Sequence, residues 1–287
     1  MRVTQSMLSN NMLRNLSNSY SKMGKLQEQI ATGKKVNRPS DDPVSVMKGL
    51  GYRMQVDKVA QFQRNIGEVH NWLDNTDDAL DKVGSALKRA YELAVNASSD
   101  TMTEEDREKI KSEMDQLQEQ IRDLANTKTG NKYLFSGTKT NEPLFKDGLY
   151  QGGADGYVNQ ISIEVFDGVS LDVNTTGEFF KDIDELFEGM KGFTAGNDFE
   201  QGIEKIQTQL DQVLTIRADV GARQNRAEMM TERLSSLEFT SIKQMSENED
   251  IDFEKAITEM ITEESILRAA LSVGANIIQP TLVDFLR

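Results

Sequence analysis

The most regular pattern in the sequence lies in residues 52–97, YRMQVDKVAQFQRNIGEVHNWLDNTDDALDKVGSALKRAYELAVNA. Residues spaced alternately by three and four positions form a seam here, and twelve of its 14 members are apolar although only 37% of the chain is apolar. The seam consists of Tyr52, Gln55, Val59, Phe62, Ile66, Val69, Leu73, Thr76, Leu80, Val83, Leu87, Ala90, Ala94 and Ala97. An alternation sustained over about seven heptads is typical of a long helix that packs as in a coiled coil.

The same spacing recurs on both sides of this stretch. It predicts helices over residues 1–32, over about 104–128, and from about 199 to 247. The last helix carries two apolar seams, which predicts more than one neighbouring helix. These seams contain Phe253, Ile257, Met260, Glu264, Leu267, Leu271, Gly274 and Ile278, and then Ile266, Ala270, Val273 and Ile277.

Two polar segments separate the terminal helices from the long ones. Gly33–Pro43 contains glycine and two prolines, which end a helix and favour turns. Asp41 or Asp42 is expected to cap the next helix, with Pro43 near its first position. Residues 247–252, ENEDID, predict a second break and a new helix start.

The middle of the chain has a different composition. Eleven of the 20 glycines lie between Gly130 and Gly196. Residues 157–166 and 169–173 alternate between apolar and polar positions on either side of Asp167-Gly168, which predicts a hairpin. Residues 178–191 are expected to add a short helix.

The predicted fold is therefore mainly α with an inserted β-rich domain, in which both chain ends form a long antiparallel helical bundle or coiled coil. Three domains are expected: residues 1–43 with 248–287 as a terminal helical assembly domain, residues 44–129 with 199–247 as a long-helix bundle, and residues 130–198 as an outer β-rich domain. Apolar seams at both chain ends are typical of a subunit that polymerises, because chain ends are normally frayed and tolerant.

Charge and composition exclude several classes of protein. The net charge is -14, and residues 1–40 alone carry +6, so the remaining chain carries -20. Such an acidic chain repels phosphate backbones, which argues against a nucleic-acid partner. The chain has no cysteine, so disulfides and thiolate sites are excluded. No apolar run reaches about 18 residues and none resembles a signal peptide, so membrane insertion is not expected and composition alone favours the cytoplasm.

Several motifs resemble a known family in the order in which they occur. Residues 26–44, LQEQIATGKKVNRPSDDPV, and the start Met1-Arg-Val-Thr4 resemble the N-terminal region of flagellins and hook-associated proteins. Residues 133–138, YLFSGT, are similar to the opening of the outer domain in junction-type members, and residues 217–226, RADVGARQNR, to the C-terminal flagellin-type helix. Residues 271–286, LSVGANIIQPTLVDFL, resemble the terminal segment of the same junction-type members. The chain is identified as a member of the flagellin superfamily by these segments, which cover roughly residues 1–138 and 200–287.

This resemblance implies a structural, self-assembling protein that is not an enzyme and uses no cofactor. It implies a place at the junction between hook and filament, with the first hook-associated protein, flagellin and a ring of its own copies as partners. It further implies export without a cleaved signal to an extracellular site, aided by a cytoplasmic chaperone that binds the C-terminal helix. The alternatives are flagellin itself and, less favoured, a cytoplasmic helical adaptor.

Two groups of residues are the candidates for these contacts. The expected assembly interface comprises Leu13, Leu16, Tyr20, Met23, Ile30, Ile257, Met260, Leu267, Leu271, Ile277, Ile278, Arg217, Arg223 and Arg226. For the three arginines, ion pairs between helices of one chain and contacts between subunits are both open. The expected spoke between domains comprises Arg38, Pro39, Asp41, Asp42 and Pro43.

Features that resemble chemical sites have simpler interpretations. Gly137-Thr-Lys-Thr140 lacks the order of a phosphate-binding loop, because Thr138 precedes Lys139. Asp74, Asp77, Asp78 and Asp81 lack the glycine of a calcium loop, and a solvated helix face is expected. His70 is the only histidine, which leaves too few members for a triad or a histidine metal cluster.

Overall fold

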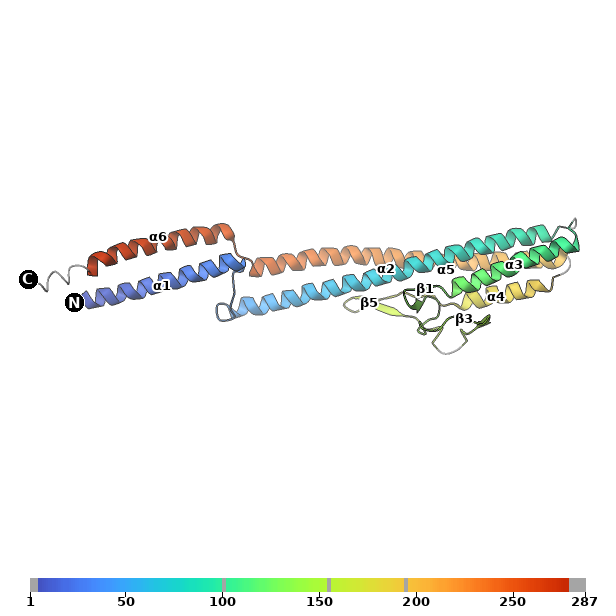
Figure 1. Ribbon diagram of the computed structural model, residues 1–287, viewed down its shortest axis with the longest axis horizontal. Helices are drawn as coiled ribbons and strands as arrows, with labels where there is room; N and C mark the ends of the chain where they lie inside the picture. Colours follow the sequence, from blue (N-terminus) through green and yellow to red (C-terminus); the bar gives the residue numbers. More distant parts are fainter. Residues whose placement is uncertain (1–4, 100–101, 154–155, 194–195, 279–287) are drawn as a thin grey trace, which may run out of the picture. The chain divides into compact units, whose positions relative to one another are not determined.

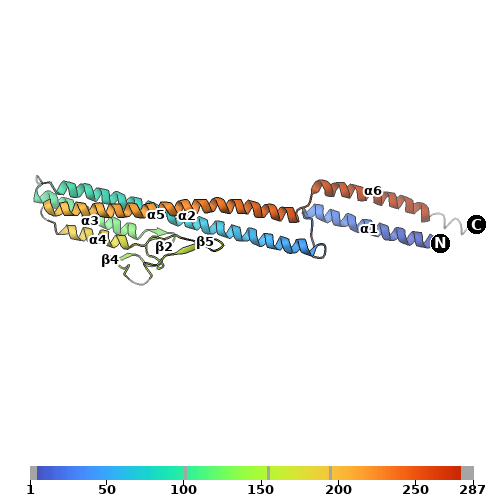
Figure 2. The same ribbon diagram turned by 180° about the vertical axis from the view of Figure 1, so that it is seen from behind.

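The computed structural model describes residues 5–99, 102–153, 156–193 and 196–278. These residues are mainly helical, as predicted, with three small antiparallel sheets (Figures 1 and 2). The helices are α1 (Gln5–Thr32), α2 (Pro43–Ala97), α3 (Glu104–Ala125), α4 (Glu178–Lys191), α5 (Gly196–Glu249) and α6 (Phe253–Ile278). No helix among the described residues carries an apolar stretch of the length that a membrane crossing requires.

The chain divides into two compact units. The terminal unit comprises residues 1–58 and 238–287, and the central unit comprises residues 59–237. The helices α2 and α5 contribute residues to both units. Each unit is described by itself below.

In the central unit, α2 and α5 pack against each other in antiparallel directions. His70 contacts Thr231, Asp74 contacts Gln224, and Asp77 contacts Arg217, so positions rise along one helix as they fall along the other. The predicted seam of α2 is buried from Val59 to Ala97, and α5 buries every seventh residue. These α5 residues are Ile206, Val213, Val220, Ala227 and Leu234. The heptad pattern therefore predicted this core correctly.

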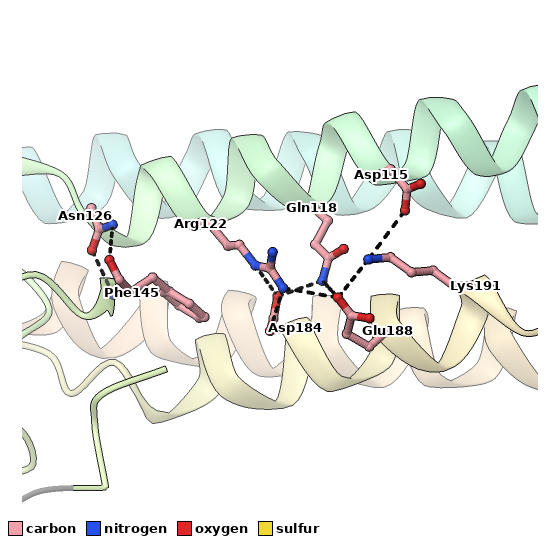
Figure 3. A network of polar contacts seen from close by, with 8 residues as sticks. All are labelled: Asp115, Gln118, Arg122, Asn126, Phe145, Asp184, Glu188 and Lys191. Atoms are coloured by element: carbon pink, nitrogen blue, oxygen red, sulfur yellow. Dashed lines mark hydrogen bonds and ion pairs between the residues drawn. The ribbon is translucent and has the colours of Figure 1, made fainter. Parts of the chain in front are cut away.

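Polar contacts also join α3 to α4 within the central unit (Figure 3). Arg122 of α3 donates from Nε and Nη2 to the two carboxylate oxygens of Asp184, at 2.7 and 3.1 Å. Gln118 donates to Asp184 and to Glu188 of α4, at 2.8 and 3.0 Å. Lys191 reaches Glu188 on its own helix and Asp115 on α3. Hydrogen bonds from Lys191 and Gln118 hold the pKa of Glu188 below its ordinary value.

The β-structure of the central unit consists of three two-stranded antiparallel sheets. They pair β1 (Lys128–Thr129) with β2 (Lys132–Tyr133), β3 (Phe145–Lys146) with β4 (Leu149–Tyr150), and β5 (Ser162–Phe166) with β6 (Val169–Asp172). The third pair is the predicted hairpin, and Gly168 at its turn has φ 69°. The short helix expected over residues 178–191 is α4, and it lies beside α3 in Figure 1.

The motif at residues 133–138 leads from β2 into a buried aromatic cluster. Leu134 and Phe135 are fully buried, and the ring of Phe135 lies 5.0 Å from that of Phe180 and 6.2 Å from that of Phe179. Gly137 follows with φ 58°, a left-handed conformation that glycine adopts without strain. The motif thus anchors the hairpin segments to α4.

In the terminal unit, α1 and α6 lie side by side in both views (Figures 1 and 2). Met12 lies against Gly274, Lys22 forms an ion pair with Glu263 at 3.4 Å, and the Gly33 carbonyl accepts a hydrogen bond from Ile251. The order of these contacts makes the pair antiparallel. The two ends of the chain therefore form one helical pair, as the sequence predicted.

Candidate assembly surfaces

The contact between α1 and α6 covers only part of the predicted interface. Leu16, Met23, Ile30 and Met260 are partly buried and Leu267 is buried, which places these five on the faces that the two helices turn toward each other. The remaining apolar candidates on the two helices are about half exposed: Leu13 58%, Tyr20 50%, Ile257 43% and Leu271 45%. The side chains of Ile277 and Ile278 lie outside the described part of the structure.

Further apolar side chains of α6 are exposed beyond these candidates. Ile261, Ile266 and Val273 are each about half exposed. Counted at 100° per residue from buried Leu267, Ile261 lies on one flank of the helix and Ile266 and Val273 lie on the other. The second seam already contained Ile266 and Val273, but Ile261 was missed because it belongs to neither seam. Apolar surface on two flanks fits a helix that has more than one neighbour.

In the terminal unit, four charged residues link the segment after α1 and the first part of α2 to the end of α5. This clasp consists of Lys34, Arg53, Glu249 and Asp250. Arg53 lies 2.6 Å from Glu249, while Lys34 lies 3.4 Å from Glu249 and 2.7 Å from Asp250. Backbone bonds pair the same segments, because Lys35 donates to the Glu249 carbonyl at 2.6 Å and Lys34 forms a bridge with Asp250. Two segments more than 200 residues apart in sequence are thereby held together.

The electrostatics of the clasp favour its charged form. Burial raises the pKa of the Glu249 carboxyl, but the hydrogen bonds and charges of Arg53 and Lys34 outweigh this and hold it below its ordinary value. The hydrogen bond from Lys34, followed by that from Ser246, lowers the pKa of Asp250. Lys34 and Arg53 have raised pKa values, mainly through their hydrogen bonds to Asp250 and Glu249 respectively. All four groups are therefore ionised at neutral pH.

Four of the five expected spoke residues lie between α1 and α2, and the fifth, Pro43, begins α2. Asp42 caps α2: Oδ1 accepts hydrogen bonds from the backbone of Val44 and Ser45 at 3.0 and 3.1 Å. Pro43 is the first residue of the helix, as predicted. Asp41 pairs with Lys25 and Arg38 with Glu28 of α1, while Pro39 is exposed. This segment therefore folds back onto α1, and its bridging role between domains stays a prediction.

The three arginine candidates lie in different environments on α5. Arg217 binds Asp77 in a bidentate manner and Asp81 at 2.6 Å, so it makes ion pairs between helices of one chain. Arg223 donates to the carbonyls of Asp172 and Asn174, which fastens the β5–β6 hairpin to α5. Arg226 is exposed and forms no ion pair with any residue that the structure describes.

A second apolar surface escaped the sequence prediction altogether. Val44, Met47, Leu50 and Met54 at the start of α2 are 52–69% exposed, and Phe239 and Ile242 near the end of α5 are 72% and 42% exposed. The prediction had followed the seam through Tyr52 and Gln55, whereas burial of the seam begins only at Val59. The available signal was the spacing of Val44, Met47 and Met54, which places them on one face of a helix.

Ion pairs and apolar faces are the chemistry that these surfaces offer. Within the described ranges, no group of histidine, aspartate and glutamate side chains is arranged to hold a metal ion. The four clustered aspartates in the middle of α2 lie near cations or amides: Asp77 and Asp81 hold Arg217, Asp78 pairs with Lys82, and Asp74 accepts from Gln224. Such surfaces suit packing between proteins.

Family models of known proteins match this chain at both of its ends. The family model described as "Bacterial flagellin N-terminal helical region" matches residues 3–140, and "Bacterial flagellin C-terminal helical region" matches residues 203–286. The flagellar hook-associated protein 3 of Escherichia coli K12 is 26% identical over 297 residues, which cover 93% of each chain.

Two solved structures have a similar fold. The putative flagellar hook-associated protein from Vibrio parahaemolyticus has a TM-score of 0.64 at 22% identity and covers 73% of this chain and 100% of its own. The Bacillus cereus protein FlgL has a TM-score of 0.60 at 25% identity and covers 68% of this chain and 99% of its own.

Proposed function

This chain belongs to the flagellin family, and from that premise we propose that it is a structural subunit of the bacterial flagellum that joins the hook to the filament. The observation that carries the proposal is the similarity to a hook-associated protein over 93% of both chains. The exposed apolar side chains on α1 and α6 support it, because contiguous exposed apolar surface marks contact sites between proteins.

The proposed partners are the first hook-associated protein on the hook side, flagellin on the filament side, and further copies of this chain in a ring. A cytoplasmic chaperone would cover the apolar flanks of α6 before export. The working site would then be extracellular. Leu13, Tyr20, Ile257 and Leu271 are the described candidates whose exposure leaves them accessible to such partners.

In this proposal, each of three parts of the chain has its own role. The helices at the two chain ends would make the assembly contacts, the long helices would form the body, and residues 130–198 would project outward as a β-rich domain. The acidic character of that last segment supports an outward position, since residues 130–200 carry five lysines, no arginine and 13 acids.

Immunogold electron microscopy of flagella tests the proposal directly. Antibody against this chain should label one short band where the hook meets the filament. A strain that lacks the gene should carry hooks without attached filaments, and a plasmid copy should restore attachment and motility. Label confined to the cytoplasm would contradict the proposal and favour a helical adaptor.

Flagellin is the second candidate, because both matching family models describe flagellin regions. The two roles differ in copy number, because a filament contains thousands of subunits whereas a junction contains only a ring of them. Label along the whole filament would establish the flagellin role. Quantification of the chain against a known flagellin in the same cells gives an independent measurement.

A further inference from the structure

The helical pair formed by α1 and α6 has two different ends. At the end beside the clasp, Gln29 of α1 donates from its side chain to the Lys35 carbonyl at 2.5 Å. At the other end, near the chain termini, the contact is apolar, with Met12 against Gly274. Among the described residues, no ion pair between α1 and α6 lies closer to the chain termini than the pair of residues 22 and 263. Polar contacts are thus concentrated at the clasp end of the pair.

The clasp joins its two segments by backbone bonds as well as by charge. Lys35 donates to the Glu249 carbonyl at 2.6 Å, and Ile251 donates to the Gly33 carbonyl at 3.0 Å. This pairing begins one residue after the end of α1 and stops two residues before the start of α6. The clasp therefore holds the neighbouring ends of the two helices side by side.

The clasp does not depend on contact between α1 and α6, because α2 and α5 already meet beside it. Asn248 donates to the Ser45 carbonyl at 2.9 Å, and Gly49 is buried against Glu249. Closing a loop between residues 34 and 250 would otherwise cost entropy that grows with loop length. Once the clasp has formed, α1 and α6 are tethered at one end, which raises the effective concentration of each helix for the other.

The two terminal helices need each other for stability. They have 28 and 26 residues, and isolated helices of this length are marginal without packing. The part of their contact nearest the tether forms at the lowest cost in entropy, because the shortest loop is closed there. We propose that the clasp is the nucleus of this helical pair, and that the contact between α1 and α6 grows from Thr32 and Phe253 toward the chain ends.

Pairs of engineered cysteines test this direction, because the chain has no cysteine of its own. The inner pair combines Lys22→Cys with Glu263→Cys, at two residues that form an ion pair, and the outer pair combines Met12→Cys with Gly274→Cys, at two residues in contact. A short bismaleimide joins two thiols only while they are close together. Its initial rate of crosslinking in the purified full chain, followed by mass spectrometry of digests, measures how often each contact is made.

Two substitutions distinguish growth from the clasp from simple fraying of the chain ends. Glu249→Gln removes the central charge of the clasp and should slow both crosslinks by about fivefold or more, although Gly274 lies about 30 Å along α6 from Phe253. Leu267→Ala removes a buried contact between the inner and outer positions. It should slow the outer crosslink by about fivefold or more and change the inner one by less than about twofold. Glu247→Gln, on an exposed residue, is the matched control and should change neither rate.

A second clasp variant guards against a direct effect of Glu249→Gln on α5. Lys34→Gln removes the cation that reaches Glu249 and Asp250 from the other segment, and it should slow both crosslinks in the same way. Helix content by circular dichroism should stay close to that of the parent chain in both variants.

Three results would overturn the inference. An outer crosslink that keeps its rate in both clasp variants would show that the helices pair without the clasp. Equal slowing of the two crosslinks by Leu267→Ala would show that the pair forms in one concerted step. Absence of both crosslinks in the parent chain would show that α1 and α6 do not pair before assembly. None of these results bears on the proposed junction role.

Discussion

Glu249 is only 9% exposed and receives hydrogen bonds and ion pairs from Arg53 and Lys34, so its charge is compensated within the clasp. Replacing it by glutamine removes the negative charge while keeping the shape. We expect Glu249→Gln to lower the free energy of unfolding by about 1–2 kcal/mol, because a charged hydrogen bond is lost in a partly buried place. Thermal unfolding followed by circular dichroism measures this change.

Glu247→Gln is the matched control for that substitution. Glu247 lies two residues earlier on α5 and pairs with Lys243 at 3.9 Å, with both side chains about two-thirds exposed. Exposed pairs contribute little, so the control should change stability by less than about 0.5 kcal/mol. Equal effects of the two substitutions would show that the clasp does not stabilise the terminal unit.

The clasp also predicts a pH dependence of a definite sign. The pKa values of Glu249 and Asp250 are lower in the folded chain than in the unfolded one. Their contribution is therefore fully present above the unfolded values of about 4, and it is lost as the pH falls through the lowered folded values. Unfolding temperatures recorded between pH 7 and pH 3 should fall less steeply in Glu249→Gln than in the parent chain. Parallel curves would contradict this account.

Gly137 is required by two independent features of its position. Its φ of 58° is costly for other residues, and an added Cβ would strike the backbone carbonyls of Gly156 and Tyr157. Gly137→Ala should therefore cost about 1–3 kcal/mol of unfolding free energy, measured by thermal denaturation. Gly153→Ala has open space around the new Cβ and serves as the control, with an expected change below about 0.5 kcal/mol.

At the scale of elements, substitutions at two adjacent residues of α6 distinguish an effect on folding from an effect on assembly. Leu267 is 6% exposed and packs toward α1, while Ile266 is 49% exposed. Leu267→Ala should weaken the helical pair by about 2 kcal/mol and raise the rate of protease cleavage in α1 at least tenfold. Ile266→Gln should leave that rate unchanged and instead reduce the fraction of hooks that carry filaments.

The reverse pattern would contradict the assignment of these two faces. Faster cleavage in Ile266→Gln would mean that Ile266 belongs to the contact with α1. Normal filament attachment in Ile266→Gln would mean that this flank of α6 makes no contact in the assembly. Leu271 lies on the other side of α6, beside Leu13 and Leu16 of α1, so Leu271→Glu does not test the flank that carries Ile266.

Local signals in the sequence predicted the elements well. Asp42 and Pro43 have the chemistry of a helix start, and α2 begins there. Thr103 precedes three acids and caps α3. Asp167-Gly168 predicted the turn of the β5–β6 hairpin because the left-handed conformation at Gly168 favours glycine. Each of these signals depends on neighbours within a few residues.

Contacts between distant residues were not predictable in the same way. Arg122 binds Asp184, 62 residues away, and Arg223 binds backbone carbonyls of residues about 50 positions earlier. A heptad pattern shows that a helix has an apolar side but does not identify which acid a given arginine will meet. The exposed apolar side chains at the start of α2 were missed for a related reason. The sequence alone does not show that Met47 and Met54 lie on the side of α2 that faces away from α5.

At the scale of the whole molecule, the central and terminal units differ in how many apolar side chains they bury. Among the described residues, the buried apolar side chains lie in the central unit, with the exceptions of Ala256 and Leu267 in α6. The terminal unit instead relies on half-buried seams and the clasp. Since apolar burial is the main term that offsets the entropy of ordering a chain, the two units should differ in local stability.

The free chain should therefore lose its terminal helices to protease before its central unit. Isolated helices of about 30 residues are marginal without packing, and α1 and α6 have only each other. Limited proteolysis of the purified chain, analysed by mass spectrometry, should trim both ends at similar rates and leave a resistant core of about residues 45–247. In purified flagella the same ends should resist, because neighbouring subunits would cover Leu13, Tyr20 and Leu271. Equal resistance of ends and core in the free chain would contradict folding coupled to assembly, and would favour an adaptor whose helical ends are complete on their own.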